Sequence, residues 1–308
     1  GYPREGVSMP PIPPPDDEVP GSPVLVDGRR VGVWRFGSAG GWPLVWNHGG
    51  LTSCGLDATV MDVAGRQCGA DIISIDRPGI GRSDAWNMPS IAQWPHIVER
   101  VANLLDLDDF AVAGWSGGGP YALACAAAMP QRVRAVASVA GMAPVERARH
   151  VLELGLWEDR LLIPTARWAP WAAAAVLWLL RHAPDRLVCR EIPRFAGSRD
   201  RAALDPSLLS SLLAVHREAT RGGVSGMVDE YRRYYGSWGV DLGKVRQSVT
   251  IWQGEQDTLV PMSIARRLAS ALPNSVLKVV PSAGHLLPLV VADEIVEDLA
   301  PLSRVCPR

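Results

Sequence analysis

A serine stands among closely spaced glycines in the segment GWSGG at 114–118, which has the pattern G-x-S-x-G. The segment follows a short apolar run at 110–113 and precedes a helical pattern that begins near Gly117. A serine on a sharp turn between a strand and a helix projects its hydroxyl from the edge of a sheet. We therefore predict that Ser116 is a nucleophile. The alternative is a Gly-rich turn that only opens a helix or cradles a phosphate.

A serine hydroxyl needs a general base to remove its proton, normally a histidine that an acid orients. His285 follows the apolar run 276–280, and Asp257 follows the run 249–252. Because the carboxyl ends of parallel strands share one edge of a sheet, both side chains are expected near Ser116. The order serine, aspartate, histidine is that of sites built on such a turn. We predict these three residues as a catalytic triad. The alternative acids are Glu255 and Glu146.

Negative charge that develops on a substrate oxygen requires two backbone amides aimed at it. One should be the amide of Gly117, the residue after the nucleophile. The other should come from the loop after the predicted strand 44–47, where Gly50 is the expected donor and Leu51 the alternative. The loop also permits a second interpretation, as a plain Gly-Gly turn. His48 is expected to brace this loop by a hydrogen bond rather than to react.

Short apolar runs alternate with helical patterns along most of the chain and would position these residues. Runs at 24–26 and 31–36 flank an Asp-Gly turn signal and predict a hairpin. Further strands are predicted at 44–47, 72–75, 110–113, 133–139, 249–252 and 276–280, and helices at about 56–68, 90–107, 117–129, 261–272 and 288–299. This alternation predicts an α/β fold with a parallel sheet and helices on both faces.

The alternation stops at 142–242, where proline-broken helical patterns replace the strands. We predict a helical cap inserted there, on a core formed by 22–141 and 243–308, behind a Pro-rich lead-in at 1–21. The apolar run 168–180 has thirteen residues, whereas a membrane span takes about 20. It therefore predicts a buried or pocket-lining helix, with contact at a membrane surface as the alternative, and we expect no stable membrane insertion.

Tryptophans are concentrated in the predicted cap. Trp168, Trp171 and Trp178 are spaced three and seven apart, which places them near one helical face if the helix runs through Pro170 or starts there. Proline is better tolerated in a first helical turn, which predicts a start near 170. Two interpretations stay open, because these side chains would either dock the cap onto the core or line a hydrophobic substrate pocket. The candidate pocket residues are Leu51, Trp115, Trp157, Trp168, Trp171 and Trp178.

Together, five segments resemble the α/β-hydrolase superfamily. They are HGG at 48–50, DRPGIGRSD at 76–84, GWSGGGP at 114–120, GEQDTLVP at 254–261 and SAGH at 282–285. The resemblance implies an eight-stranded, mostly parallel sheet whose first strand pair is antiparallel. It implies the same triad and oxyanion amides, and Asp76 and Arg77 as residues that brace the active-site loops.

Two departures from known relatives narrow the expected chemistry. A serine at position 116, rather than an aspartate, argues against haloalkane dehalogenase and epoxide hydrolase reactions. Leu51 and Thr52 follow the HGG segment where proline iminopeptidases have Pro-Gly, so that specificity is not supported. The resemblance is to the superfamily and does not single out one member.

Composition excludes several other classes of protein. The chain has 308 residues, 47% of them hydrophobic, and a formal net charge of −1. This is not the composition of a disordered chain, and there is no basic excess for binding nucleic acid. Five widely spaced cysteines form no CxxC pair or Cys/His cluster, and 1–20 does not resemble a signal peptide. We expect a cytoplasmic protein that needs no metal or organic cofactor.

The expected function is a serine hydrolase that cleaves a carboxylic ester, lactone or thioester of an apolar small molecule through an acyl-serine intermediate. The alternative is a non-hydrolytic enzyme of the same fold, such as a cyclase, lyase or transacylase of secondary metabolism. A third hypothesis is a ligand receptor on an inactive hydrolase scaffold. The expected partner is the substrate, with no nucleic acid, and a homodimer formed through an apolar cap surface stays open.

Overall fold

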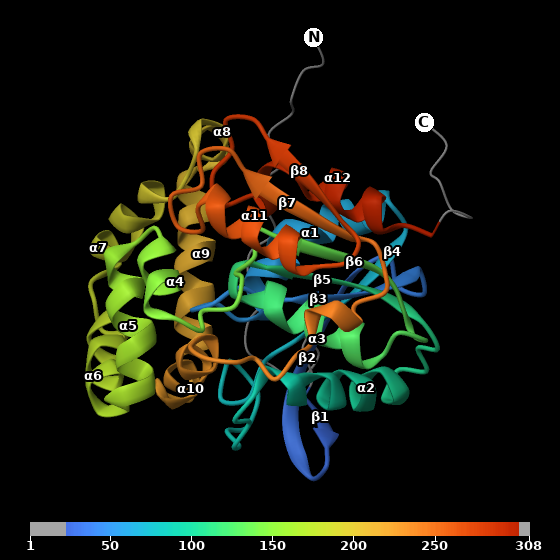
Figure 1. The fold of residues 1–308 in the computed structure, drawn as a ribbon, viewed down its shortest axis with the longest axis horizontal. Helices are drawn as coiled ribbons and strands as arrows, with labels where there is room; N and C mark the ends of the chain where they lie inside the picture. The colour runs from blue at the N-terminus through green and yellow to red at the C-terminus, as the bar shows by residue number, and fades with distance from the viewer. Residues whose placement is uncertain (1–22, 302–308) are drawn as a thin grey trace.

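A computed structural model describes residues 23–301, which form one eight-stranded sheet surrounded by helices (Figure 1). The order of the strands is β1-β2-β4-β3-β5-β6-β7-β8. Their bounds are β1 Pro23–Val26, β2 Arg29–Gly37, β3 Trp42–Asn47, β4 Ala70–Ile75, β5 Phe110–Trp115, β6 Val133–Val139, β7 Val249–Gly254 and β8 Ser275–Val280. The predicted Pro-rich lead-in at 1–21 lies outside the described residues.

Strand direction follows the expected pattern, with one addition. β1 and β2 are antiparallel, as expected, and β2 is also antiparallel to β4. All other neighbouring strands are parallel. Parallel strands bring their carboxyl ends to one edge, so the loops after β3, β5, β7 and β8 emerge together. Those loops carry Gly50, Ser116, Asp257 and His285.

Helices cover both faces of the sheet, which confirms the predicted layers (Figure 1). α1 Cys54–Gln67 and α12 Pro288–Leu299 pack on one face, where they bury residues such as Met61 and Ile295. On the other face lie α2 Trp94–Leu104, α3 Gly119–Ala128 and α11 Met262–Ala271, with residues such as Trp94 and Leu268 in the core. All six residues of β5 are buried, as expected for a central strand covered on both sides.

Seven α-helices lie between β6 and β7 in the described chain, and we call residues 148–234 the helical insertion. They are α4 Ala148–Glu153, α5 Trp157–Trp168, α6 Pro170–Arg181, α7 Asp185–Glu191, α8 Ser198–Ala203, α9 Pro206–Ala219 and α10 Ser225–Tyr234. Figure 1 shows most of them to one side of the sheet. α6 begins at Pro170, as predicted, because proline has no amide hydrogen to lose in a first turn. The exact boundaries of a cap at 142–242 stay a prediction.

Short 3₁₀ helices shift two of the predicted helix starts. η1 Ile91–Gln93 precedes α2, and η2 Ser116–Gly118 precedes α3, so the helix predicted from about 117 begins at Gly119. Ser116, the first residue of η2, has a positive φ, which an α-helix does not allow. Two further 3₁₀ helices are η3 Ile192–Arg194 and η4 Leu242–Lys244. Within 23–301, none of the helices has both the length and the apolar character needed to cross a membrane.

Candidate active site

Ser116 occupies a strained turn at the carboxyl end of β5. Its φ is +54°, in the left-handed region that side chains other than glycine rarely adopt. The neighbouring backbone is packed so closely that a methyl group on Gly114 would overlap the Gly118 backbone. A methyl group on Gly118 would likewise overlap the carbonyl of Asn47 at the end of β3. The glycines are therefore required by close backbone approach, and the turn presents Ser116 to a pocket.

Asp257 and His285 meet at the same edge of the sheet. His285 Nδ1 donates to Asp257 Oδ2 over 2.9 Å, and both side chains are almost fully buried. The other carboxylate oxygen, Oδ1, accepts from the amides of Leu259 and Val260 at 2.9 Å each. These bonds fix the carboxylate and, through it, the imidazole. With Nδ1 engaged, Nε2 is the nitrogen left for a partner on the pocket side.

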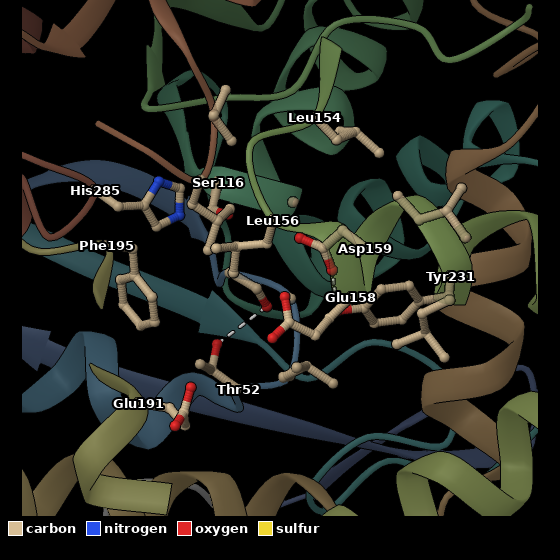
Figure 2. Close-up of a pocket in the computed structure, with 18 of the residues that line it drawn as sticks. Thr52, Ser116, Leu154, Leu156, Glu158, Asp159, Glu191, Phe195, Tyr231 and His285 are labelled. Carbon is tan, nitrogen blue, oxygen red and sulfur yellow. Dashed lines mark hydrogen bonds between the residues drawn. The ribbon is translucent and has the colours of Figure 1, made fainter. Parts of the chain in front are cut away.

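The structure brings Ser116 and His285 to the wall of one pocket (Figure 2). Of the three acids considered, it is Asp257 that contacts the imidazole. Glu255 is exposed and accepts from the amide of Ser282 at 3.0 Å, and Glu146 is exposed. The predicted triad residues therefore lie together in the order and at the strand ends that the sequence indicates.

A buried aspartate from the helical insertion, Asp200 of α8, clamps the loop that carries His285. Its carboxylate accepts from the amides of Gly284 at 3.0 Å and Leu286 at 3.1 Å. The amide of His285 itself donates to the carbonyl of Phe195 over 3.0 Å. Asp200 was not identified from the sequence, because nothing in its local pattern distinguishes it from an exposed helical residue.

The two predicted amide donors, Gly50 and Gly117, both line the pocket beside Ser116. A Cβ atom on Gly117 would lie 3.1 Å from the amide nitrogen of Gly50, so the two segments are closely apposed. Leu51 follows with a φ of +58°, and its carbonyl accepts from His216 Nδ1 at 3.1 Å. The loop after β3 is thus bent and tethered on its pocket side.

On its other side, the same loop is braced by Arg77. Its Nη1 donates to the carbonyl of His48 over 2.7 Å, and its Nη2 donates to that of Gly49 over 2.8 Å. Arg77 also forms an ion pair with Glu230 of α10, and both side chains are fully buried. Burial lowers the pKa of His48 well below its ordinary value, and Arg77 acts in the same direction. His48 is therefore a neutral, hydrogen-bonding brace, as predicted.

Within the described chain, one group of side chains has the spacing of metal ligands. His48, Cys54 and Asp76 offer ligand atoms within 4.8 Å of one another, and all three are buried. Both ring nitrogens of His48 already take part in hydrogen bonds. Asp76 accepts from the indole of Trp34 and from the amides of Cys54 and Arg82. We therefore infer that these three residues brace the loops of the site, which is the role that the resemblance implied for Asp76.

The pocket has a volume of about 540 Å³, a size typical of small-molecule sites. Its walls come from the active-site loops and from the helical insertion, and they are mainly apolar. Representative apolar residues are Leu154, Leu161, Ile163, Val176, Leu177 and Phe195. Three of the predicted pocket residues, Leu51, Trp115 and Trp157, line it as well. Trp115 is buried, and its indole donates to the carbonyl of His285 over 2.9 Å.

The prediction for the other three tryptophans is wrong. Trp168, Trp171 and Trp178 do not line the pocket, and their exposed fractions are 72%, 77% and 52%. α6 instead turns residues such as Val176 and Leu177 toward the cavity. Helical spacing correctly groups side chains on a face, but it does not indicate which face is turned inward. Pocket lining therefore does not describe these three side chains, and Trp168 instead makes an edge-on ring contact with Tyr235 at a centroid distance of 6.5 Å.

An acidic residue, Asp159 at the start of α5, also reaches the largely apolar pocket and was missed from the sequence (Figure 2). Tyr231 donates a hydrogen bond to its Oδ1 over 3.4 Å. Burial raises the pKa of Asp159 to about 6, against the opposing effects of His285 and of the Tyr231 hydrogen bond. Glu158, Glu191 and Arg194 lie on the same wall, and Arg194 is paired with both glutamates.

Replacing Asp159 by asparagine is expected to stabilise the protein at neutral pH. The ordinary pKa is 3.8 and the folded value is about 6, so between these values the folded state binds a proton that the unfolded state has lost. Stability therefore falls as pH rises through this window, and the loss is complete above it. The free energy of unfolding of Asp159→Asn should exceed that of wild type by about 1 to 3 kcal/mol at pH 7.5.

Urea unfolding at pH 4 and pH 7.5 measures this difference. The gain should be small at pH 4, where the folded wild type is already protonated. The matched control is Asp108→Asn, at an exposed loop position, for which we expect little change at either pH. If Asp159→Asn raised the free energy of unfolding equally at both pH values, the assignment of the raised pKa to Asp159 would be contradicted.

Comparison with known proteins adds the following findings. The model of the family described as alpha/beta hydrolase fold matches residues 43–290. The uncharacterized hydrolase YugF of Bacillus subtilis (strain 168) is 24% identical over 280 residues, which cover 89% of this chain and 94% of that protein. A poly(3-hydroxyalkanoate) depolymerase of Ectopseudomonas oleovorans is 25% identical over 236 residues, covering 73% of this chain and 72% of the relative.

Solved structures are similar in fold at lower identity. The enol-lactonase from Burkholderia xenovorans LB400 superposes with a TM-score of 0.66 at 18% identity, covering 89% of this chain and 96% of that one. The esterase RhEst1 from Rhodococcus sp. ECU1013 gives a TM-score of 0.66 at 19% identity, covering 90% and 98%. These likenesses agree with the sheet order and helical layers described above.

Proposed function

Because this chain belongs to the alpha/beta hydrolase fold family, we propose that it is a serine hydrolase acting on an ester, lactone or thioester of an apolar small molecule. The observation that supports this most strongly is the 2.9 Å bond between His285 and Asp257, with Ser116 on the same pocket wall. Relatives named as a hydrolase and as a depolymerase agree with hydrolytic chemistry. The apolar walls favour an apolar acyl or alcohol group.

In the acylation half-reaction, His285 Nε2 accepts the proton of the Ser116 hydroxyl as Oγ bonds to the substrate carbonyl carbon. The electron pair of the carbonyl double bond moves to oxygen, where the amides of Gly50 and Gly117 stabilise the negative charge. As the tetrahedral intermediate collapses, the bond to the leaving group breaks, and the protonated His285 donates its proton to that group. Asp257 stabilises the imidazolium throughout without touching the substrate.

In the deacylation half-reaction, water takes the place of the leaving group. His285 accepts a proton from the water as its oxygen attacks the acyl carbon, and the same two amides hold the second oxyanion. Collapse breaks the bond to Ser116 Oγ and returns the proton from His285 to the serine. The products are a carboxylic acid and the alcohol or thiol released earlier.

Labelling with a fluorophosphonate probe tests the proposal directly. The probe phosphonylates an activated serine with loss of fluoride, so the adduct is expected on Ser116 when the labelled protein is digested and its peptides are mapped. Heat-denatured protein should not be labelled, because the activation depends on the folded site. A folded protein that stays unlabelled, or an adduct on another residue, would overturn the proposed nucleophile.

A parallel series of p-nitrophenyl esters with increasing acyl length measures turnover and the size of the pocket. We expect hydrolysis, with a preference that declines once the acyl group exceeds the cavity. Labelling at Ser116 without turnover of any ester would instead indicate an acyl acceptor other than water, as in a transacylase.

A further inference from the structure

The hydroxyl of Tyr234, at the end of α10, has no hydrogen-bond partner although it is buried. The residue is 2% exposed, and it lines the pocket together with Ser116 and His285. Buried polar groups are nearly always paired, so an unpaired one calls for an explanation. Its position at a cavity wall suggests that the missing partner is a bound molecule.

The hydroxyl lies beside the two predicted amide donors. A Cβ atom on Gly117 would overlap Tyr234 Oη, and a Cβ atom on Gly50 would lie 3.6 Å from it. The small size of both glycines therefore leaves room for the phenol at this point. Tyr234 Oη therefore lies close to both predicted amide donors, in the lining of the pocket that Ser116 also lines.

Two aromatic rings pack against the ring of Tyr234, and burial favours the neutral form of its hydroxyl. The ring makes edge-on contacts with Tyr231 and Tyr121, at centroid distances of 5.8 Å and 6.5 Å. Burial raises the pKa of Tyr234 well above its ordinary value, Glu230 acts in the same direction, and Arg77 opposes it. The hydroxyl therefore keeps its proton at neutral pH and can donate a hydrogen bond.

We propose, on the basis of the serine hydrolase function above, that Tyr234 Oη donates a third hydrogen bond to the substrate carbonyl oxygen as it becomes an oxyanion. No proton is transferred, because the hydroxyl only shares its hydrogen with the developing charge. Side-chain donors of this kind stabilise the transition state in addition to backbone amides. Tyr234 is thus a catalytic residue of this site, contributed by the helical insertion.

Replacing Tyr234 by phenylalanine removes the hydroxyl and keeps the ring. We expect kcat to fall about 10- to 100-fold with little change in KM, because the bond strengthens as charge develops. We expect the melting temperature to stay the same or rise, because no partner in the folded protein is lost. The matched control is Tyr235→Phe, the next residue, which lies outside the pocket and should keep wild-type kinetics.

An inhibitor with a trifluoromethyl ketone group provides a second readout, since its adduct with the serine carries an oxyanion. Its affinity should fall in Tyr234→Phe by about the same factor as kcat/KM. Unchanged kcat and inhibitor affinity in Tyr234→Phe would overturn the proposal, as would a faster variant, which would mean that the hydroxyl blocks the oxyanion position. A fall in melting temperature with a matching loss of active sites would assign Tyr234 a structural role only.

The two proposals fail in distinguishable ways. Wild-type protein that is labelled at Ser116 and hydrolyses esters, combined with an unaffected Tyr234→Phe, would leave the serine mechanism standing and remove the tyrosine from it. Wild-type protein that is not labelled would remove the serine mechanism itself.

Discussion

Replacement of Ser116 by alanine is expected to lower kcat for ester hydrolysis by about a millionfold, because the acyl-enzyme can no longer form. KM should change little, since the pocket walls that bind the substrate are untouched. Alanine accepts the positive φ at this position at much the same cost as serine, so the fold should persist. Steady-state kinetics with the best p-nitrophenyl ester, together with a thermal unfolding curve, measure both expectations.

The control is Ser270→Ala, an exposed serine of α11 whose hydroxyl bonds to the carbonyl of Arg266 within its own helix. It should keep full activity. Adding His285→Ala to Ser116→Ala should lower the rate little further, because the two residues act as one unit. Substantial burst-phase hydrolysis by Ser116→Ala would contradict the mechanism and move the nucleophile to another group.

Replacement of Glu230 by alanine is expected to lower the free energy of unfolding by about 3 to 5 kcal/mol, because it leaves the buried charge of Arg77 unpaired. Both side chains of this pair are fully buried. Arg77 also holds the carbonyls of His48 and Gly49, so any shift of its guanidinium disturbs the loop that carries Gly50. Urea unfolding at pH 7.5 measures the loss of stability.

An exposed ion pair provides the control. Arg134 and Asp109 form one whose side chains are 63% and 51% exposed, and Asp109→Ala should cost less than about 1 kcal/mol. A double variant, Arg77→Met with Glu230→Met, should recover part of the stability lost in Glu230→Ala, since it removes both charges. If Glu230→Ala and Asp109→Ala lowered the free energy of unfolding by equally small amounts, the importance assigned to the ion pair of Arg77 and Glu230 would be contradicted.

The parts of the site that could be predicted from sequence depend on local patterns. A G-x-S-x-G segment between an apolar run and a helix predicts Ser116 at a strand end. Asp257 and His285 each follow another apolar run, and parallel strands bring such ends to one edge. The sheet and its two helical layers follow from the same alternation of buried strands and helices.

The parts that could not be predicted depend on contacts between segments far apart in the chain. Asp200 and Glu230 lie in helices with no motif, and their roles arise only where α8 and α10 meet the loops of the sheet. Tyr234 is significant because its hydroxyl lies close to Gly50 and Gly117, which are more than a hundred residues away in the chain. The tryptophans of α5 and α6 show the same limit, because periodicity groups a face without orienting it.

Several contacts fasten the helical insertion to the loops of the candidate site, and the two through buried charged side chains are Asp200 near its middle and Glu230 near its end. α5 and α6 supply pocket wall but none of the triad, its clamps or the amide donors. We therefore expect substitutions on the inner face of these two helices to change what fits in the cavity while leaving the predicted triad and amide donors in place. Because of this division, α5 and α6 form the segment in which selection can alter substrate preference at least cost to catalysis. The same two helices are the first choice for a mutagenesis library.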